Sequence, residues 1–132
     1  MNQKGHEYPD FFPDGCPPKE AQPVELKVYR LVKEDKISKS DFKSFIEEGR
    51  DARNPKFPYV EYGLSVNTEY EEIRRYWRGN AALKKKFKNI ASGVTYKYTG
   101  VVKSTPSRIQ KNHYTWWLCK NVSPENYFKI VR

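Results

Sequence analysis

One histidine stands in a strongly patterned segment of this chain and is the clearest candidate for acid–base chemistry. His113 opens the stretch HYTWWLCK, and Arg108, Lys111 and Tyr114 lie close to it in the sequence. An imidazole titrates near neutral pH, and cationic neighbours lower its pKa, which suits a general base. The expected chemistry is metal-independent cleavage of RNA by His113 with an Arg or Lys. The alternative is a histidine held in a structural hydrogen bond.

Arg30 is the second residue that breaks its local pattern. Residues 24–33, VELKVYRLVK, alternate apolar and polar side chains and predict a strand. Arg30 falls on the apolar face of that strand, between Val28 and Val32. An inward guanidinium needs a carboxylate, several carbonyls or an anionic ligand. We expect either that Arg30 binds an anion in a cleft, or that its guanidinium reaches water at the end of the strand.

Basic residues gather in the second half of the chain. The net charge is +9, yet residues 1–72 hold 11 Lys or Arg and 15 Asp or Glu, whereas residues 73–132 hold 14 basic residues and one acid. Such a stretch is typical of a surface that docks a polyanion. The leading prediction is a small basic protein that binds nucleic acid or another polyphosphate. Its backbone contacts would come from Arg74, Arg75, Arg78, Lys84, Lys85, Lys86, Lys103, Arg108 and Lys111.

Two other interpretations of this charge stay open. The basic half could pack against the acidic half, or it could dock on an acidic protein partner.

Two adjacent tryptophans raise the question of what covers each face of a sheet. In a strand, Trp116 and Trp117 point to opposite sides. Trp116 shares its side with Tyr114 and Leu118, which is the better core face. Trp117 is then either buried under a second layer or lines an open groove, where it and Tyr114 are candidates for stacking on bases.

These residues must be positioned by one small α+β domain. The length of 132 residues and an aromatic share of 15% predict a single core rich in rings. We expect a twisted, mainly antiparallel sheet with two or three short helices in residues 25–132. Residues 1–24 are rich in proline and are expected to wrap the domain. The helices are predicted between Ser40 and Gly49, between Thr68 and Gly79, and between Asn80 and Gly93.

The order of VYRLV, a short helix, YGLSV leading into a helix, and later strands resembles small ADP-ribosyltransferase-like domains. In that family an Arg or His on the first strand meets the nicotinamide dinucleotide, and a Ser, Thr or Tyr follows on a later strand. The resemblance covers about half of the chain and implies NAD as cofactor, with Arg30 and Ser65 as catalytic residues. The family's late Glu has no clear match, since Glu125 falls in a turn. The chain is also similar to small uncharacterised bacterial proteins, which implies no function.

The cysteines and the hydropathy bear on compartment and metals. The amino-terminal segment has no apolar run, and no segment has the length and hydropathy of a membrane span. We therefore expect a cytoplasmic protein with reduced thiols, although a disulfide between Cys16 and Cys119 stays possible. His6, Cys16, His113 and Cys119 have the right number for zinc, but their spacing matches no compact ligand motif, so no metal is expected.

Overall fold

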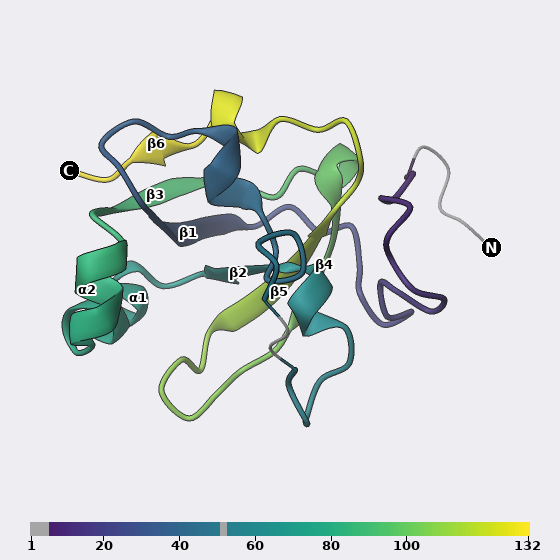
Figure 1. Cartoon of the computed structure of the whole chain (residues 1–132), viewed down its shortest axis with the longest axis horizontal. Helices are drawn as coiled ribbons and strands as arrows, with labels where there is room; N and C mark the ends of the chain where they lie inside the picture. The colour runs from purple at the N-terminus through teal and green to yellow at the C-terminus, as the bar shows by residue number, and fades with distance from the viewer. Residues whose placement is uncertain (1–5, 51–52) are drawn as a thin grey trace.

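The fold is built around one antiparallel sheet. The computed structural model describes residues 6–50 and 53–132, arranged as Figure 1 shows. Within them the strands pair in the order β4-β5-β2-β1-β3-β6, and every pair is antiparallel. They are β1 (Lys27–Val32), β2 (Leu64–Asn67), β3 (Asn89–Val94), β4 (Gly100–Ser104), β5 (His113–Leu118) and β6 (Lys129–Ile130).

Short helical elements complete the described part and confirm the predicted α+β class. The helices α1 (Tyr70–Arg78) and α2 (Ala81–Lys86) lie together at one side of the sheet (Figure 1). The 3₁₀ turns are η1 (Lys39–Phe42), η2 (Val60–Tyr62), η3 (Lys97–Thr99) and η4 (Pro124–Asn126).

The adjacent tryptophans lie on opposite faces, and both faces are covered. Trp116 belongs to the main core, where its ring stacks on Phe128 with 5.8 Å between ring centroids. Trp117 belongs to a second cluster with Ala21 and Val101. Both tryptophans are 0% exposed. The choice left open by the sequence is thereby settled in favour of a buried Trp117.

The proline-rich amino-terminal segment supplies much of the second cover. Tyr8 and Phe12 pack against the Trp117 cluster, and their rings stack with 5.7 Å between centroids. The Trp117 indole donates to the carbonyl of Tyr59 at 3.0 Å. The predicted stacking of Trp117 on a base is therefore wrong, because both its ring and its N–H are occupied. Tyr114 is half-buried against the Trp116 core.

Two predicted helices are shorter than the apolar periodicity indicated. The helix expected after Ser40 is only η1, and its cap is Ser38. The Asp41 carboxylate accepts from the backbone N–H groups of Ser38 at 2.9 Å and Lys33 at 3.0 Å, which closes a tight turn here. The helix after Asn80 does carry the predicted cap, since Asn80 accepts from the Leu83 N–H at 3.1 Å.

That last helix ends at Lys86 because the next residues are needed by the sheet. Ile90, which falls inside the helix predicted between Asn80 and Gly93, pairs instead with Leu31 of β1. The start of α1, predicted at Thr68, is shifted by one residue: its N-cap is Glu69, whose N–H donates to the side chain of Asn67 at 2.7 Å. At Ile90, tertiary pairing thus overrides local helix propensity.

The sheet is split between β1 and β2. β1 pairs with β3 along its whole length, from Lys27↔Val94 to Val32↔Asn89. With β2 it pairs at Tyr29↔Asn67, and the strands then separate. Backbone groups of β2 beyond this point need partners other than β1, and this opening holds the candidate site.

Replacing Trp117 with Ala should destabilise the fold strongly. The change empties a fully buried space and removes the indole donor to the Tyr59 carbonyl, which keeps its hydrogen bond from the Tyr62 N–H. We expect the free energy of unfolding to fall by about 3–5 kcal/mol, measured by urea denaturation. Tyr98→Ala is the control, because Tyr98 is 63% exposed. A loss below about 1 kcal/mol for Trp117→Ala would contradict the second core.

Candidate active site

A cavity of about 570 Å³ lies at the opening of the sheet. Its walls come from β1, β2, β5, both helices and the connection between β1 and β2. Arg30, Ser65 and His113 all line it. The structure therefore brings together His113, which the sequence suggested for RNA cleavage, with Arg30 and Ser65, which the transferase resemblance suggested.

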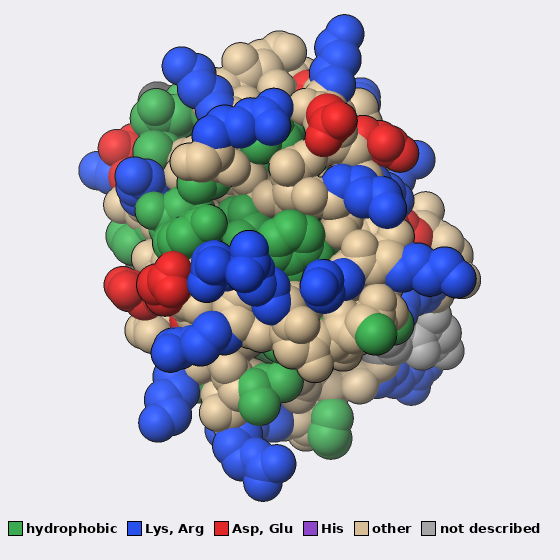
Figure 2. All heavy atoms as spheres, turned by 90° about the vertical axis from the view of Figure 1, so that its left-hand side faces the viewer, with side chains coloured by type: hydrophobic (Ala, Val, Ile, Leu, Met, Phe, Trp, Pro, Cys, Tyr) green, Lys and Arg blue, Asp and Glu red, His purple; other side chains and the backbone are tan. Residues whose placement is uncertain are grey.

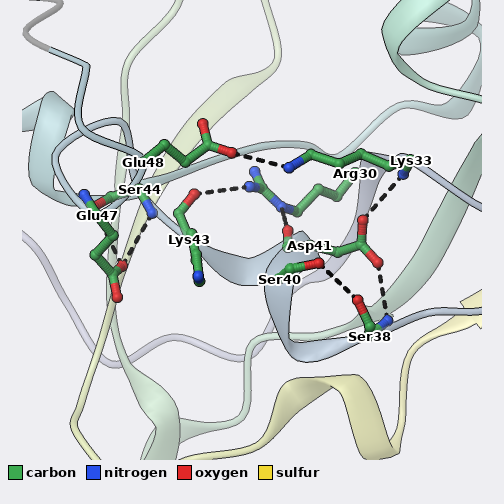
Figure 3. Close-up of polar contacts among 9 residues, drawn as sticks. All are labelled: Arg30, Lys33, Ser38, Ser40, Asp41, Lys43, Ser44, Glu47 and Glu48. Atoms are coloured by element: carbon green, nitrogen blue, oxygen red, sulfur yellow. Dashed lines mark hydrogen bonds and ion pairs between the residues drawn. The ribbon is translucent and has the colours of Figure 1, made fainter.

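Arg30 closes the gap between β1 and β2. Its Nε donates to the Asp41 carbonyl at 2.7 Å, and its two terminal nitrogens donate to the carbonyls of Ser65 at 2.7 Å and Lys43 at 3.5 Å. Figure 3 shows the contacts to Asp41 and Lys43. Burial lowers the pKa of Arg30 to about 10, although Glu48 and Asp41 oppose the shift. The guanidinium is thus held by carbonyls, and it stays cationic at neutral pH.

The connection after β1 is folded so that it presents these carbonyls. The buried Asp41 carboxylate accepts from the Lys33 and Ser38 N–H groups. Further along, Lys33 pairs with Glu48 at 3.2 Å, and the Glu47 carboxylate accepts from the Ser44 N–H at 3.0 Å. Figure 3 shows these contacts around Arg30. The carboxylates near Arg30 are therefore engaged in local structure.

Ser65 and His113 are joined across the pair β2–β5. The register Ser65↔Thr115 and Asn67↔His113 places both side chains on one face of the sheet. The Ser65 hydroxyl forms a hydrogen bond with His113 Nε2, and Ser65 itself is exposed to the cavity.

The hydrogen bonds of His113 assign its tautomer. Nδ1 lies 3.0 Å from the carbonyl oxygen of Thr105, which can only accept, so Nδ1 carries the proton. Nε2 is then the basic nitrogen, and the Ser65 hydroxyl donates to it. The Thr105 hydroxyl lies 2.8 Å from that of Thr115 and 2.9 Å from Nδ1, which fixes the plane of the ring. This is the arrangement of an oriented general base.

Electrostatics keep His113 in its neutral form. Burial lowers the pKa of His113, and the positive charge of Arg30 lowers it further. The Thr105 carbonyl and Glu72 act in the opposite direction but do not outweigh burial. His113 Nε2 is therefore available to take a proton at neutral pH.

Cations and aromatic rings line the walls around this centre. The Arg50 guanidinium lies 4.4 Å from the centroid of the Phe45 ring, and the Lys86 ammonium lies 5.2 Å from that of Phe87. The basic residues of the lining are Arg30, Lys33, Lys43, Arg50, Arg53 and Lys86. Its acids, Asp41 and Glu48, are those engaged in local structure. A cavity with these walls favours an anionic ligand that also carries a flat ring.

The predicted polyanion contacts are spread over several elements. Arg74, Arg75 and Arg78 lie on α1, and Lys84, Lys85 and Lys86 lie on α2, where Lys86 reaches the cavity. Figure 2 shows this side of the molecule, with hydrophobic side chains at its centre bordered by Lys and Arg.

The remaining predicted contacts lie outside the helices. Lys103 is on β4, where its ammonium lies 5.4 Å from the ring centroid of Phe57. Arg108 and Lys111 are in the loop between β4 and β5. Glu72 of α1 ties that loop to the helix, since its carboxylate accepts from the backbone N–H of Asn112 at 2.8 Å.

Several site residues could not be found from the sequence. Thr105 acts through its backbone carbonyl, as do Asp41 and Lys43, and a carbonyl has no residue signature. Phe45 and Tyr76 line the cavity, and neither was among the predicted site residues. The available signal for the β2–β5 contact was alternation: polar side chains stand at every second position, at Ser65 and Asn67 and again at His113 and Thr115.

Comparison with known proteins supplies no family. No family model matches the chain, and no curated protein or solved structure is significantly similar to it. Within residues 6–50 and 53–132, no helix is long and apolar enough to cross a membrane. The same residues contain no group of three or more His, Cys, Asp or Glu that could hold a metal ion. Cys16 and Cys119 are free thiols.

The low pKa of His113 should appear in the pH dependence of stability. A histidine that stays neutral when folded but takes a proton when unfolded opposes folding at acid pH. The free energy of unfolding should therefore fall as pH drops below about 6.5, the ordinary histidine value. In His113→Gln this dependence should be weaker, measured by urea denaturation at several pH values. An unchanged profile in the variant would contradict the lowered pKa.

Arg30→Ala should destabilise the fold although it removes an unusual buried charge. Three carbonyls would lose their donor where β1 and β2 separate. We expect a loss of about 3 kcal/mol or more in the free energy of unfolding, measured in urea. Arg75→Ala, at an exposed position of α1, is the matched control and should change stability little. Equal stabilities of the two variants would show that the carbonyls find other partners.

Proposed function

We propose that this protein is an ADP-ribosyltransferase-like enzyme that binds NAD in the cavity of Arg30, Ser65 and His113. The observation that carries the proposal is the Ser65–His113 hydrogen bond, set beside an arginine that contacts Ser65 in the same cation-lined cavity. Arg30 and Ser65 are also the residues that the sequence resemblance to this family singled out.

The cavity has features that suit a dinucleotide with two phosphates. A guanidinium has five N–H donors, and three of those on Arg30 are engaged with carbonyls, which leaves donors for a phosphate oxygen. Lys43 and Arg50 line the same walls, and the Phe45 ring offers a flat surface. The volume of about 570 Å³ lies within the usual range of small-molecule sites.

The chain departs from the family at the late catalytic Glu. Glu125 lies in η4 and does not line the cavity. Asp41 and Glu48 do line it, but Asp41 caps a turn and Glu48 pairs with Lys33. The group with a free basic atom at the centre is His113 Nε2, so we assign the role of the base to His113.

The proposed step uses these residues in distinct roles. NAD supplies an ADP-ribosyl group bonded to nicotinamide, which departs with the bonding electron pair. The remaining donors of Arg30 hold a phosphate and stay charged throughout. His113 Nε2 takes the proton that the acceptor loses as its lone pair bonds to the ribose carbon. Ser65 holds His113 in place and can pass that proton to Nε2.

Two measurements test the proposal. Titration calorimetry should detect NAD binding at micromolar to millimolar concentrations, and the release of nicotinamide should follow on longer incubation. His113→Gln should slow release by about 10²-fold, and Ser65→Ala by about 10-fold, while binding persists because Arg30 remains. The control is Ser104→Ala, since Ser104 is exposed on β4.

The pH profile separates a base from a structural histidine. Because the pKa of His113 is lowered, the rate should still be level at about pH 6.5, the ordinary histidine value, and should fall only at lower pH. Absence of NAD binding at millimolar concentration would overturn the proposal. Cleavage of RNA without NAD, lost in His113→Gln, would instead favour the ribonuclease that the sequence also suggested.

A further inference from the structure

A group of exposed cations covers the two helices beside the cavity. The α1–α2 cationic surface comprises Arg75, Arg78, Lys84, Lys85 and Lys86, all of which are exposed. In the part of the chain that the structure describes, none of them forms an ion pair, whereas their neighbour Arg74 lies 3.7 Å from Glu71. An ordinary surface intersperses both signs, so unpaired cations at this density favour a polyanionic partner.

This surface is continuous with the wall of the cavity. Leu83 and Phe87 flank the α2 lysines and line the cavity, and Lys86 belongs to both regions. Tyr76 lines the cavity from α1, between Arg75 and Arg78 in the sequence. A chain of phosphates lying along the helices would therefore lead into the cavity.

The loop between β4 and β5 extends the same surface. Its Asn112 donates two hydrogen bonds to the Glu72 carboxylate of α1, from the backbone at 2.8 Å and from the side chain at 3.1 Å. These contacts keep Arg108 and Lys111 in a loop that adjoins α1.

We infer that the α1–α2 cationic surface binds the phosphodiester backbone of single-stranded nucleic acid and delivers one nucleotide to the cavity as the ADP-ribosyl acceptor. The assignment of the acceptor rests on the proposed function. A hydroxyl or ring nitrogen of that nucleotide forms the bond to the ribose carbon, nicotinamide leaves with its electron pair, and His113 takes the proton.

Aromatic rings at the cavity favour a nucleic acid over an acidic protein. Tyr76, Phe87 and Phe45 line the cavity together with the cations of Lys86 and Arg50. Single-strand binders combine a cationic track with rings on which bases stack. An acidic peptide would be held by the cations but would leave these rings unused. A duplex would keep its bases stacked within itself and away from the cavity.

The test compares two variants with the same change in net charge. Lys84→Glu/Lys85→Glu alters the surface, and Lys19→Glu/Lys97→Glu alters exposed lysines of the amino-terminal segment and η3, on the other side of the sheet from the helices (Figure 1). The probe is a fluorescein-labelled single-stranded RNA or DNA of about 12 nucleotides, followed by anisotropy between 50 and 200 mM salt.

The surface variant should bind at least about 10-fold more weakly, and its salt dependence should be shallower by about 0.7 for each phosphate that it no longer binds. The control should bind within about twofold of the wild type. Circular dichroism should show both variants folded, because these lysines are exposed. If both variants bind the oligonucleotide equally weakly, the effect is one of net charge and the inference is overturned. Absence of binding by the wild type at 50 mM salt would also overturn it.

Separate readouts distinguish failure of this inference from failure of the proposed function. Incubation with NAD labelled on its adenine ring should transfer label to the oligonucleotide, and Ser65→Ala should bind the oligonucleotide normally but label it more slowly. NAD turnover without oligonucleotide binding would sink the inference and leave the proposed function standing. If the oligonucleotide binds through Lys84 and Lys85 but NAD does not bind, the nucleic-acid surface is supported and the proposed transferase function is overturned. Preferential binding of an acidic peptide by the same lysines would also overturn the inference.

Discussion

The organisation of this domain depends on a guanidinium placed where two strands separate. β1 and β2 pair at Tyr29↔Asn67, and beyond that point Arg30 donates to the Ser65 carbonyl, on an edge of β2 where no partner strand is paired. The same guanidinium binds the carbonyls of Asp41 and Lys43 and so holds the connection that walls the cavity. A buried cation is costly without partners, so the opening of the sheet, the path of the connection and the position of Arg30 are mutually dependent.

This dependence links the fold to the chemistry of the cavity. The positive charge of Arg30 helps to lower the pKa of His113. Arg30 also donates to the backbone carbonyl of Ser65, whose hydroxyl forms the hydrogen bond with His113 Nε2. Since the proton on Nδ1 is fixed by Thr105, the orientation of the base is decided by backbone geometry. The sheet therefore carries the hydrogen-bonded pair of Ser65 and His113, while the helices and the connection between β1 and β2 supply cationic and aromatic walls.

The sequence predicted the strands of the sheet better than the site between them. Alternation at residues 24–33 and 113–118 follows from the period of a strand, and the inward Arg30 was visible as a break in it. That Arg30 is satisfied by carbonyls could not be predicted, because every residue has one. The contact of Ser65 with His113 depends on the register between strands 48 residues apart, and local periodicity contains no information on register.

The wrong predictions, of a longer helix after Asn80 and of an open Trp117, have the same origin in long-range contacts. Leu83, Phe87 and Ile90 have helical spacing, yet Ile90 is needed opposite Leu31, so the helix ends early. The burial of Trp117 likewise depends on a segment about 100 residues away in the sequence, a distance at which composition alone cannot identify a cover.

The division of charge along the sequence acquires a physical meaning from these contacts. Several acids of the first half satisfy backbone and amide donors: Asp41 binds two N–H groups, Glu47 binds one, and Glu72 holds Asn67 and Asn112. Carboxylates used in this way lie beside the groups they hold, so they do not cover the cations of α1 and α2. Among the described residues, the exposed cations Arg75, Arg78, Lys84, Lys85 and Lys86 form no ion pair with the acids of the first half, so their positive field remains. Because that field borders the cavity of Arg30 and His113, an anionic chain drawn to the helices would arrive where the base is held.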